Sequence, residues 1–451
     1  MSKFITINRS EVYLFPPSVA DWLPEEHLAK FIVEVVDNLD LSAITRKYGG
    51  KGSDAHHPST LIALLIYGYA TGVFSSRKIE QATHDSVAFR YIAANTHPDH
   101  STLANFRKNY RAEFEAIFMQ VLLVAKEMKL LKLGNVSLDG SKVKANASKH
   151  RALSYGHILN LEEQLETEIK QLLQQAATTD NKPYDDMNIP AELARREDRL
   201  RGIAAAKAKI EERAKIKDEE AKKRYEAKVA KREEEQQKTG KKPKGKEPKA
   251  PDTGAQSRDQ ISLTDEESRI MKTAGGGFIQ GYNAQAAVDT DTMLIISTGV
   301  TQDCNDKKQI TPMLKKLSAL PEELGKVNNL LADTGYFSAN NVECCIENKI
   351  MPLIAMNREQ HNLALDKRFA PDIPEPDTEL AIEKMAWRLK TKAGRALYAV
   401  RKSTVEPVFG IIKNVMGFRQ FSMRGLEKVT GEWTLVAIAW NLKRLNVLRM
   451  G

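Results

Sequence analysis

Three acidic residues stand where they could share a metal-dependent reaction. Asp139 ends the segment NVSLD and precedes Gly140, Asp333 ends NNLLAD, and Glu406 opens EPVFGIIK. Glu406 is expected near the start of a helix, because Pro407 suits a first turn, where its missing N–H costs nothing. Carboxylate oxygens are ligands that Mg²⁺ prefers, and two such ions about 3.5–4 Å apart stabilise the attacking and leaving oxygens of phosphodiester transfer. Without metals, three converging carboxylates would repel one another.

Each acid also has a structural interpretation, because an Asp before Gly at a strand end is often only a turn former. Asp289 and Asp303 are two further strand-end acids, secondary candidates for a metal role and otherwise surface residues. The sequence has no motif for a phosphate-binding loop, a histidine metal site or a serine nucleophile. The Gly275–Gly277 run is not followed by Gly-Lys-Ser/Thr, His56 and His57 have no partners at ligand spacing, and no G-x-S-x-G segment occurs.

Two of these acids, Asp139 and Asp333, lie in strand-like segments rich in β-branched and apolar residues. Strands are expected within 134–150, 277–290, 293–303, 328–335 and 350–356, with the first strand ending at a glycine turn. Helical patterns at 305–320 and 338–349 flank the fourth of them. Strands in hairpin style that then alternate with helices predict a mixed α/β sheet. Sites in such sheets form beside strand ends, where Asp139 and Asp333 stand.

The region before these strands is predicted to be all-helical. Three helices are expected between residues 59 and 133, capped by Ser59, by Ser75 or Ser76, and by Ser101. The third, over 102–128, carries an apolar face at helical spacing. Its exposed face is expected to hold Arg107, Lys108 and Arg111. Short helices joined by tight turns suit a helix-turn-helix DNA reader or an ordinary small bundle.

A long insertion separates the first strand from the others. Residues 191–236 are rich in Ala, Glu, Lys and Arg and predict a charged helical arm, and 238–260 read as a flexible basic linker. The arm is either a solvated spacer or a clamp for DNA or for a second copy. The predicted domains are therefore 1–133, with a linker at about 49–58, then 134–150 joined with 273–446, and the insertion 151–272.

Charge and composition limit the class of protein. The net charge of the 451 residues is +9, and from Lys384 to Gly451 there are 14 Lys and Arg residues against three Asp and Glu. This basic end suits a polyanionic partner or a solubilising surface. No apolar run approaches the roughly 18 residues that span a bilayer, and the N-terminus lacks a signal-peptide pattern. Three cysteines without metal-site spacing favour a reducing, cytoplasmic setting.

Several segments resemble those of insertion-sequence transposases. The run HPSTLIALLIYGYATGVFSSRKIEQATHDSVAFRYI with DHSTLANFR is similar to their N-terminal region, and LADTGYFS is similar to the motif of their second catalytic Asp. Tyr398, Arg401, Glu406 and Lys413 resemble their Tyr-Arg-Glu-Lys signature. The spacing from Arg401 to Glu406 is one residue longer than the common form, so Lys402 is an alternative to Arg401.

The resemblance implies an RNase H-like fold with an Asp-Asp-Glu triad, here Asp139, Asp333 and Glu406, as catalytic residues and metal ligands. It implies two Mg²⁺ ions, with Mn²⁺ able to substitute. Lys413 and Arg401 would hold DNA phosphates, while Tyr398 would stack on a base or ribose or simply pack.

The implied function is metal-dependent DNA cleavage and strand transfer at the terminal inverted repeats of an insertion sequence. The expected partners are those ends, the target DNA and further copies of the chain, as a homodimer or larger assembly, without a membrane. The expected location is the bacterial cytoplasm at the nucleoid. Two alternatives remain open, namely an inactive transposase relic acting as a DNA-binding regulator and a structural protein assembled through its charged arm.

Overall fold

The structure is a computed structural model, and it describes residues 18–48, 55–148, 151–179, 189–240, 245–273, 275–357, 371–372 and 374–451. Residues 49–54 of the predicted N-terminal linker and 241–244 of the predicted basic linker lie outside the described residues. The chain forms two compact units, Met1–Ala145 with Tyr282–Gly451, and Asn146–Gly281. Each is described by itself.

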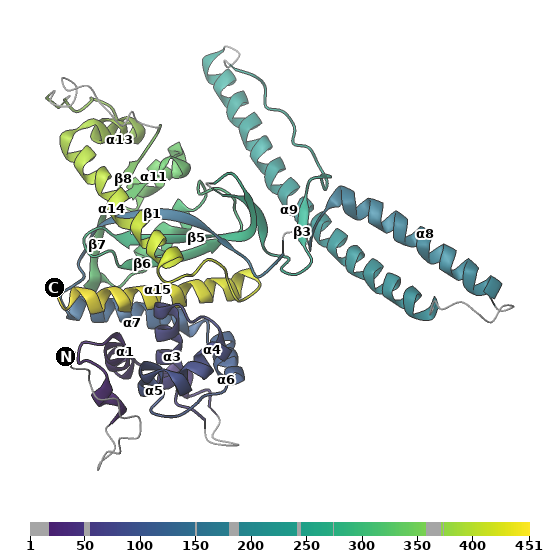
Figure 1. The fold of residues 1–451 in the computed structure, drawn as a ribbon. Helices are drawn as coiled ribbons and strands as arrows, with labels where there is room; N and C mark the ends of the chain where they lie inside the picture. Colours follow the sequence, from purple (N-terminus) through teal and green to yellow (C-terminus); the bar gives the residue numbers. More distant parts are fainter. Residues whose placement is uncertain are drawn as a thin grey trace, which may run out of the picture. The chain divides into compact units, whose positions relative to one another are not determined.

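The first unit is organised around a mixed sheet (Figure 1). Its strands run in the order β6-β5-β1-β7-β8, with β5 and β6 antiparallel and β1, β7 and β8 parallel. Strand β5 is buried from Gln280 to Asp289, and the last three residues of β7, Leu330, Leu331 and Ala332, are buried. The bounds are β1 Leu133–Lys144, β5 Phe278–Asp289, β6 Ile295–Thr301, β7 Gly325–Ala332 and β8 Met351–Ile354.

The register of β1 against β7 decides where the two strand-end acids lie. The last paired positions are Leu138 and Ala332, so Asp139 and Asp333 follow side by side on parallel strands. The prediction that the first strand ends at a glycine turn is wrong, because β1 runs through Gly140 to Lys144. Its last residues are held by the loop before the C-terminal helix, where Lys144 exchanges backbone hydrogen bonds with Arg419 and Phe421.

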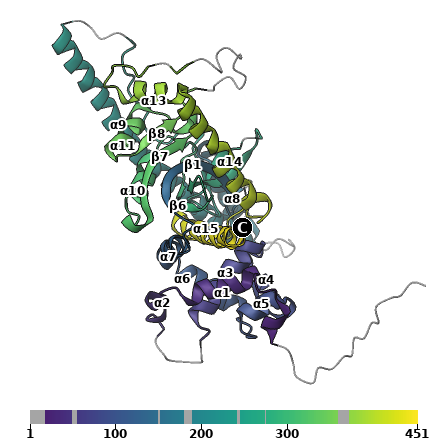
Figure 2. The ribbon, with the colours of Figure 1, turned by 90° about the vertical axis from the view of Figure 1, so that its left-hand side faces the viewer.

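Helices pack on the sheet in the first unit. The buried helix α15 lies between β6 on one side and the N-terminal helices α3 and α7 on the other (Figures 1 and 2). Asn441 of α15 hydrogen-bonds both the N–H and the C=O of Ile295 in β6, at 2.8 and 2.7 Å. The bounds are α10 Ile310–Ser318, α11 Ala339–Glu347, α13 Ala381–Lys390, α14 Lys392–Asn414 and α15 Leu426–Leu448, with the 3-10 turns η3 Glu322–Leu324 and η4 Thr334–Tyr336.

The N-terminal region is helical, as predicted, but its helices are shorter. The expected helix over 102–128 is two helices broken at residues 110–112, and Asp99 rather than Ser101 caps the first of them. The helix after residue 58 is capped by His57 instead of Ser59. The bounds are η1 Val19–Trp22, α1 Leu28–Asp37, α2 Ser42–Thr45, α3 Pro58–Thr71, α4 Ser76–Asp85, α5 Val87–Ile92, α6 His100–Asn109 and α7 Glu113–Glu127.

The second unit is a helical hairpin with short strands at its base. Helix α8, Tyr155–Thr179, lies beside α9, Ile189–Thr239, which is 51 residues long (Figure 1). An apolar cluster shared by α8, α9 and β3 consists of Ile158, Leu165, Ile203, Ala206, Ile210 and Ile261. Strand β2, Ala152–Ser154, pairs with β3, Gln260–Ser262, and β4, Arg269–Lys272, pairs with the start of β5.

The described part of the predicted basic linker runs back along α9. Arg232 donates to the carbonyls of Gly245 and Lys246 at 2.8 and 3.0 Å, and the Gly254 N–H donates to Asp218 at 2.6 Å. The charged half of α9 therefore has a second segment beside it, which the composition of the linker alone does not predict.

Among the described residues no single helix has the length and apolar character to cross a membrane. Helices α3 and α4, bent by 96° at their junction, pass that test of length and composition only as a pair.

Candidate active site

Asp139 and Asp333 lie at the sheet edge where β1 and β7 stop pairing. One oxygen of each carboxylate is used locally. Oδ1 of Asp139 accepts from the Gly140 N–H and Oδ1 of Asp333 from the Gly335 N–H, both at 2.8 Å, the second bond capping η4. The turn-forming interpretation of Asp333 is thus correct for one oxygen. The Oδ2 atoms of both carboxylates face a common neighbour, the side chain of Arg401.

Glu406 reaches the same place from α14, but not from the start of a helix. Thr391 caps α14 and the helix begins at Lys392, so the prediction that Pro407 lies in a first turn is wrong. A proline inside a helix removes one i→i−4 bond and destabilises it by about 3 kcal/mol. Here it leaves the Ser403 carbonyl without that partner, one turn before the acid.

Arg401 joins all three acids through one guanidinium group. Its Nη1 donates to Oε1 of Glu406 at 2.7 Å. Its Nη2 lies 3.5 Å from Oδ2 of Asp139 and 3.7 Å from Oδ2 of Asp333. The Arg401 side chain is 9% exposed, whereas those of Asp333 and Glu406 are 42% and 51% exposed. The cluster therefore has a buried cation at its base and two carboxylates open to solvent.

One guanidinium group carries too little positive charge to neutralise three carboxylates. Burial raises the pKa of Asp139 to about 6, and the charges of Asp333 and Asp306 add to that rise. Arg401 and the Gly140 N–H lower this pKa but do not offset the burial. The pKa of the nearby Lys413 is lowered, mainly by burial and also by Lys142, while Asp139 raises it. The raised pKa of Asp139 indicates that Arg401 does not fully neutralise this carboxylate.

The carboxylates fit a divalent cation by chemistry, with one rearrangement. Their oxygens are the donors that hard ions prefer, and Arg401 shows that a positive charge is accepted among them. Within the described part of the chain, however, these acids do not form a group whose ligand atoms all lie within 4.8 Å. Arg401 stands between them. A shared ion therefore requires the guanidinium to release some of its partners.

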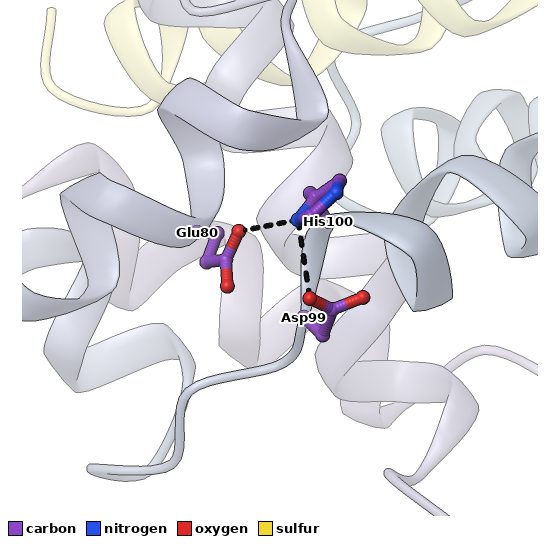
Figure 3. Close-up of side chains that lie close together, drawn as sticks. All are labelled: Glu80, Asp99 and His100. Atoms are coloured by element: carbon purple, nitrogen blue, oxygen red, sulfur yellow. Dashed lines mark hydrogen bonds and ion pairs between the residues drawn. The ribbon is translucent and has the colours of Figure 1, made fainter.

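A different group, Glu80, Asp99 and His100, meets that distance criterion (Figure 3). Nδ1 of His100 lies 2.8 Å from Glu80 and 3.1 Å from Asp99. The second oxygen of Asp99 caps α6 by accepting from the Ser101 N–H at 2.7 Å. The cluster thus links α4 to the start of α6, so a structural role accounts for all three residues.

The other residues of the C-terminal pattern attach α14 to β1 and to the end of β7. Tyr398 donates its hydroxyl to the carbonyl of Ala332, at 3.3 Å, and Lys413 donates to Ser141 Oγ and to the Lys142 carbonyl, at 2.5 and 2.9 Å. Lys402 is exposed. Of the two basic candidates, Arg401 therefore faces the acids.

The predicted basic face of the third N-terminal helix is only partly exposed. Arg107 is buried and donates to the Tyr69 hydroxyl and the Phe74 carbonyl, at 2.9 and 3.1 Å, so its predicted exposure is wrong. It lies four residues after Leu103 and three before Tyr110, on the apolar face of the helical period. Lys108 is exposed, and Arg111 is half-buried and paired with Glu427 at the start of α15.

The two secondary acids lie outside the cluster around Arg401. Asp289 is buried in the β5–β6 turn and accepts from the N–H and hydroxyl of Thr292, and Asp303 accepts from Gln309 at 2.9 Å. Asp306, which the sequence analysis does not identify, lies close to Gly140, next to Asp139. Its position after a strand and before α10, in QDCND, is the signal that could have drawn attention to it.

Comparison with protein families identifies two transposase domains in the chain. A family model described as a transposase DDE domain matches residues 227–442, and one described as a transposase domain (DUF772) matches residues 17–109. The chain belongs to the DDE transposases. No curated protein and no solved structure matches it. These domains are typical of insertion-sequence transposases, which act on DNA phosphodiester bonds with divalent metal ions.

The matched residues of the transposase contain Asp333, Glu406 and Arg401 but not Asp139. The catalytic-domain match begins inside α9, after the first strand and most of the insertion. Asp139 is therefore linked to the other acids by geometry, through the β1–β7 register and Arg401.

Proposed function

We propose that Asp139, Asp333 and Glu406 are the catalytic carboxylates of this transposase and hold two Mg²⁺ ions, with Mn²⁺ able to substitute. The observation that carries this assignment is the meeting of all three acids at Arg401, from β1, the end of β7 and α14. Bound metal ions would supply an activated oxygen nucleophile and charge stabilisation at the phosphate. The proposed reaction is cleavage of the terminal inverted repeats and transfer of their strands to target DNA.

The chain's own residues would prepare the site in two ways. The bonds from Tyr398 and Lys413 fix α14 to the end of β7 and to β1, which sets the position of Glu406 relative to the two aspartates. The hydrogen bonds from Gly140 and Gly335 fix the Oδ1 atoms and leave the Oδ2 atoms for other partners. Positioned carboxylates of this kind reduce the reorganisation needed when the DNA arrives.

Arg401 would exchange partners during the reaction. Its guanidinium neutralises part of the acidic cluster before metal binds and competes with metal for the same oxygens. Once released, the planar group could bind a DNA phosphate through paired hydrogen bonds. Lys413 has two bonds to β1, so its contribution to phosphate binding would come from its charge.

DNA binding would use exposed basic residues of α14 and of the N-terminal helices. Lys402 on α14 and Lys108 on α6 are exposed, and Arg111 lies near Lys108. The basic stretch from Lys384 to Gly451 provides a larger sequence-independent attraction. Because two ends must be joined to one target, we expect two or more copies of the chain on DNA, acting at the bacterial nucleoid.

A cleavage assay with Mg²⁺ or Mn²⁺ on DNA carrying the element's own ends tests this proposal. Wild type should nick at the ends, whereas Asp139→Asn, Asp333→Asn and Glu406→Gln should bind the same DNA without nicking it. Asp303→Asn, which changes an acid outside the cluster, is the matched control and should nick normally. Nicking by any of the three acid variants at the wild-type rate would contradict the assignment of that residue.

A further inference from the structure

Asp306 is a fourth acid at this sheet edge, contributed by the loop between β6 and α10. Its Oδ1 accepts from Asn283 Nδ2 and from Gln285 Nε2, each at 2.7 Å, and its Oδ2 lies 3.7 Å from Lys142 Nζ. Asn283 and Gln285 are fully buried in β5, which neighbours β1. Two amides inside a strand are expensive to bury unless they are hydrogen-bonded.

The glycines beside the catalytic aspartates show how closely Asp306 approaches them. A methyl group on Gly140, next to Asp139, would lie 2.1 Å from Gln285 Nε2 and 2.5 Å from Asp306 Oδ1. A methyl group on Gly335 would lie 3.0 Å from Asp333 Oδ1 and 3.6 Å from Asp306 Oδ2. The absence of a side chain at Gly140 thus lets the Asp306–Gln285 pair reach the backbone of β1.

The same pair continues to the turn that carries Asp333. The buried hydroxyl of Tyr336, in η4, donates to Gln285 Oε1. The chain of contacts is therefore Asp306 to Gln285 to Tyr336, and it ends three residues after Asp333. Asn283 also lies close to this glycine. Its buried Oδ1 has no hydrogen-bond partner among the residues that the structure describes, and it lies 3.0 Å from the position of a Gly140 methyl group.

We propose that Asp306 is a positioning residue of the active site, which holds the Asp139 and Asp333 carboxylates in register for metal binding through Gln285 and Tyr336. The inference rests on the proposed catalytic role of those two aspartates. Asp306 supplies a charged acceptor for the Gln285 amide, and a hydrogen bond to a charged group is about twice as strong as one to the neutral amide that Asn would offer. Gln285 then presents its oxygen to Tyr336 and so fixes η4, while the Asp306 carboxylate lies close against the backbone of Gly140.

The test compares Asp306→Asn with Asp303→Asn, a charge-neutralising change in the same loop. Mn²⁺ binding is measured from the electron paramagnetic resonance of the free ion, end nicking is measured over a range of Mn²⁺ concentrations, and thermal unfolding is followed in EDTA. Loss of a group that orients metal ligands weakens metal binding or activity by about tenfold or more. Asp306→Asn should therefore need about tenfold more Mn²⁺, recover part of its nicking at high Mn²⁺, and unfold near the wild-type temperature. Asp303→Asn should match wild type.

Tyr336→Phe, which removes only the hydroxyl, provides a second measurement should Asp306→Asn unfold. It should weaken Mn²⁺ binding in the same direction, and the double variant should lose less than the sum of the two single losses, because both act through Gln285. Normal Mn²⁺ binding by Asp306→Asn, or by Tyr336→Phe where Asp306→Asn does not fold, would overturn the inference while wild type still nicks. A wild-type protein that neither binds Mn²⁺ nor nicks would instead overturn the catalytic assignment itself.

Discussion

Two buried arginines of the first unit hold acids in contrasting ways. Arg107 donates to Tyr69, whose hydroxyl donates to Glu432 at 2.8 Å, and Glu432 also accepts backbone N–H groups of the loop before α15. Glu432 is 1% exposed, so this group is closed and its one carboxylate is fully hydrogen-bonded. Arg401 instead faces three carboxylates, two of them open to solvent.

The difference separates a structural charge from a functional one. A closed and balanced group gains nothing from another ion, and removing one partner leaves a buried charge uncompensated. An open group with three carboxylates and one guanidinium attracts cations and depends on them. The comparison predicts that metal matters around Arg401 and has no effect around Arg107.

The largest expected effect is on catalysis at the open cluster. Asp139→Asn or Asp333→Asn should reduce end nicking about a thousandfold, since metal-ion stabilisation of several kcal/mol is lost. In EDTA neither variant should be less stable to unfolding than wild type, because each substitution removes a negative charge from the cluster. Nicking rates are measured on the DNA ends at saturating protein. A reduction of less than tenfold would contradict a functional role for the carboxylates around Arg401.

Arg107→Ala should produce the largest loss of stability. Breaking a buried charged group by removing one partner destabilises a protein by about 3–5 kcal/mol. Chemical unfolding with and without Mn²⁺ measures the effect, and Mn²⁺ should not reverse it. Recovery with Mn²⁺ would mean that the two arginines do not differ as described.

Arg401→Ala should also lower stability in EDTA, because three acids then repel one another without a cation. Here Mn²⁺ should restore the unfolding temperature and bind more tightly than in wild type, because the competing guanidinium is gone. Nicking should nevertheless fall if Arg401 binds phosphate. Unfolding that does not respond to Mn²⁺ would contradict the competition between arginine and metal.

The smallest expected effect is on pH dependence. The pKa of Asp139 is raised to about 6 in the folded, metal-free protein, so its protonated form is favoured. The associated stability is fully present below about pH 4 and is lost as the pH rises to about 6. Asp139→Asn should remove this part of the pH profile in EDTA. An identical profile in wild type and variant would place the titrating group elsewhere.

Much of the sheet and the pairing of two acids could be predicted from the sequence. Asp139 and Asp333 end apolar segments, and the ends of parallel strands meet at one sheet edge. The RNase H-like class agrees with the mixed sheet and with the DDE-domain match. The assignments of all three acids as catalytic residues stay predictions until the nicking assay.

What could not be predicted depends on tertiary contacts. The charge of Arg107 predicts an exposed residue. Its helical phase instead places it on the same face as Leu103, where its guanidinium donates to the buried Tyr69 hydroxyl. Pro407 suggested a helix start, but packing of α14 on β1 and β7 overrides that local preference. The sequence does not single out Asp306, because its partners Asn283 and Gln285 lie on β5, 23 and 21 residues earlier, and only the pairing of the strands brings them together.

A crystal structure with the element's DNA end and Mn²⁺ tests the central claim most directly. Anomalous scattering should place Mn²⁺ between Asp139, Asp333 and Glu406, with Arg401 turned away from at least one of them. Mn²⁺ bound only at Glu80, Asp99 and His100, with Arg401 still contacting all three acids beside the DNA end, would contradict the account.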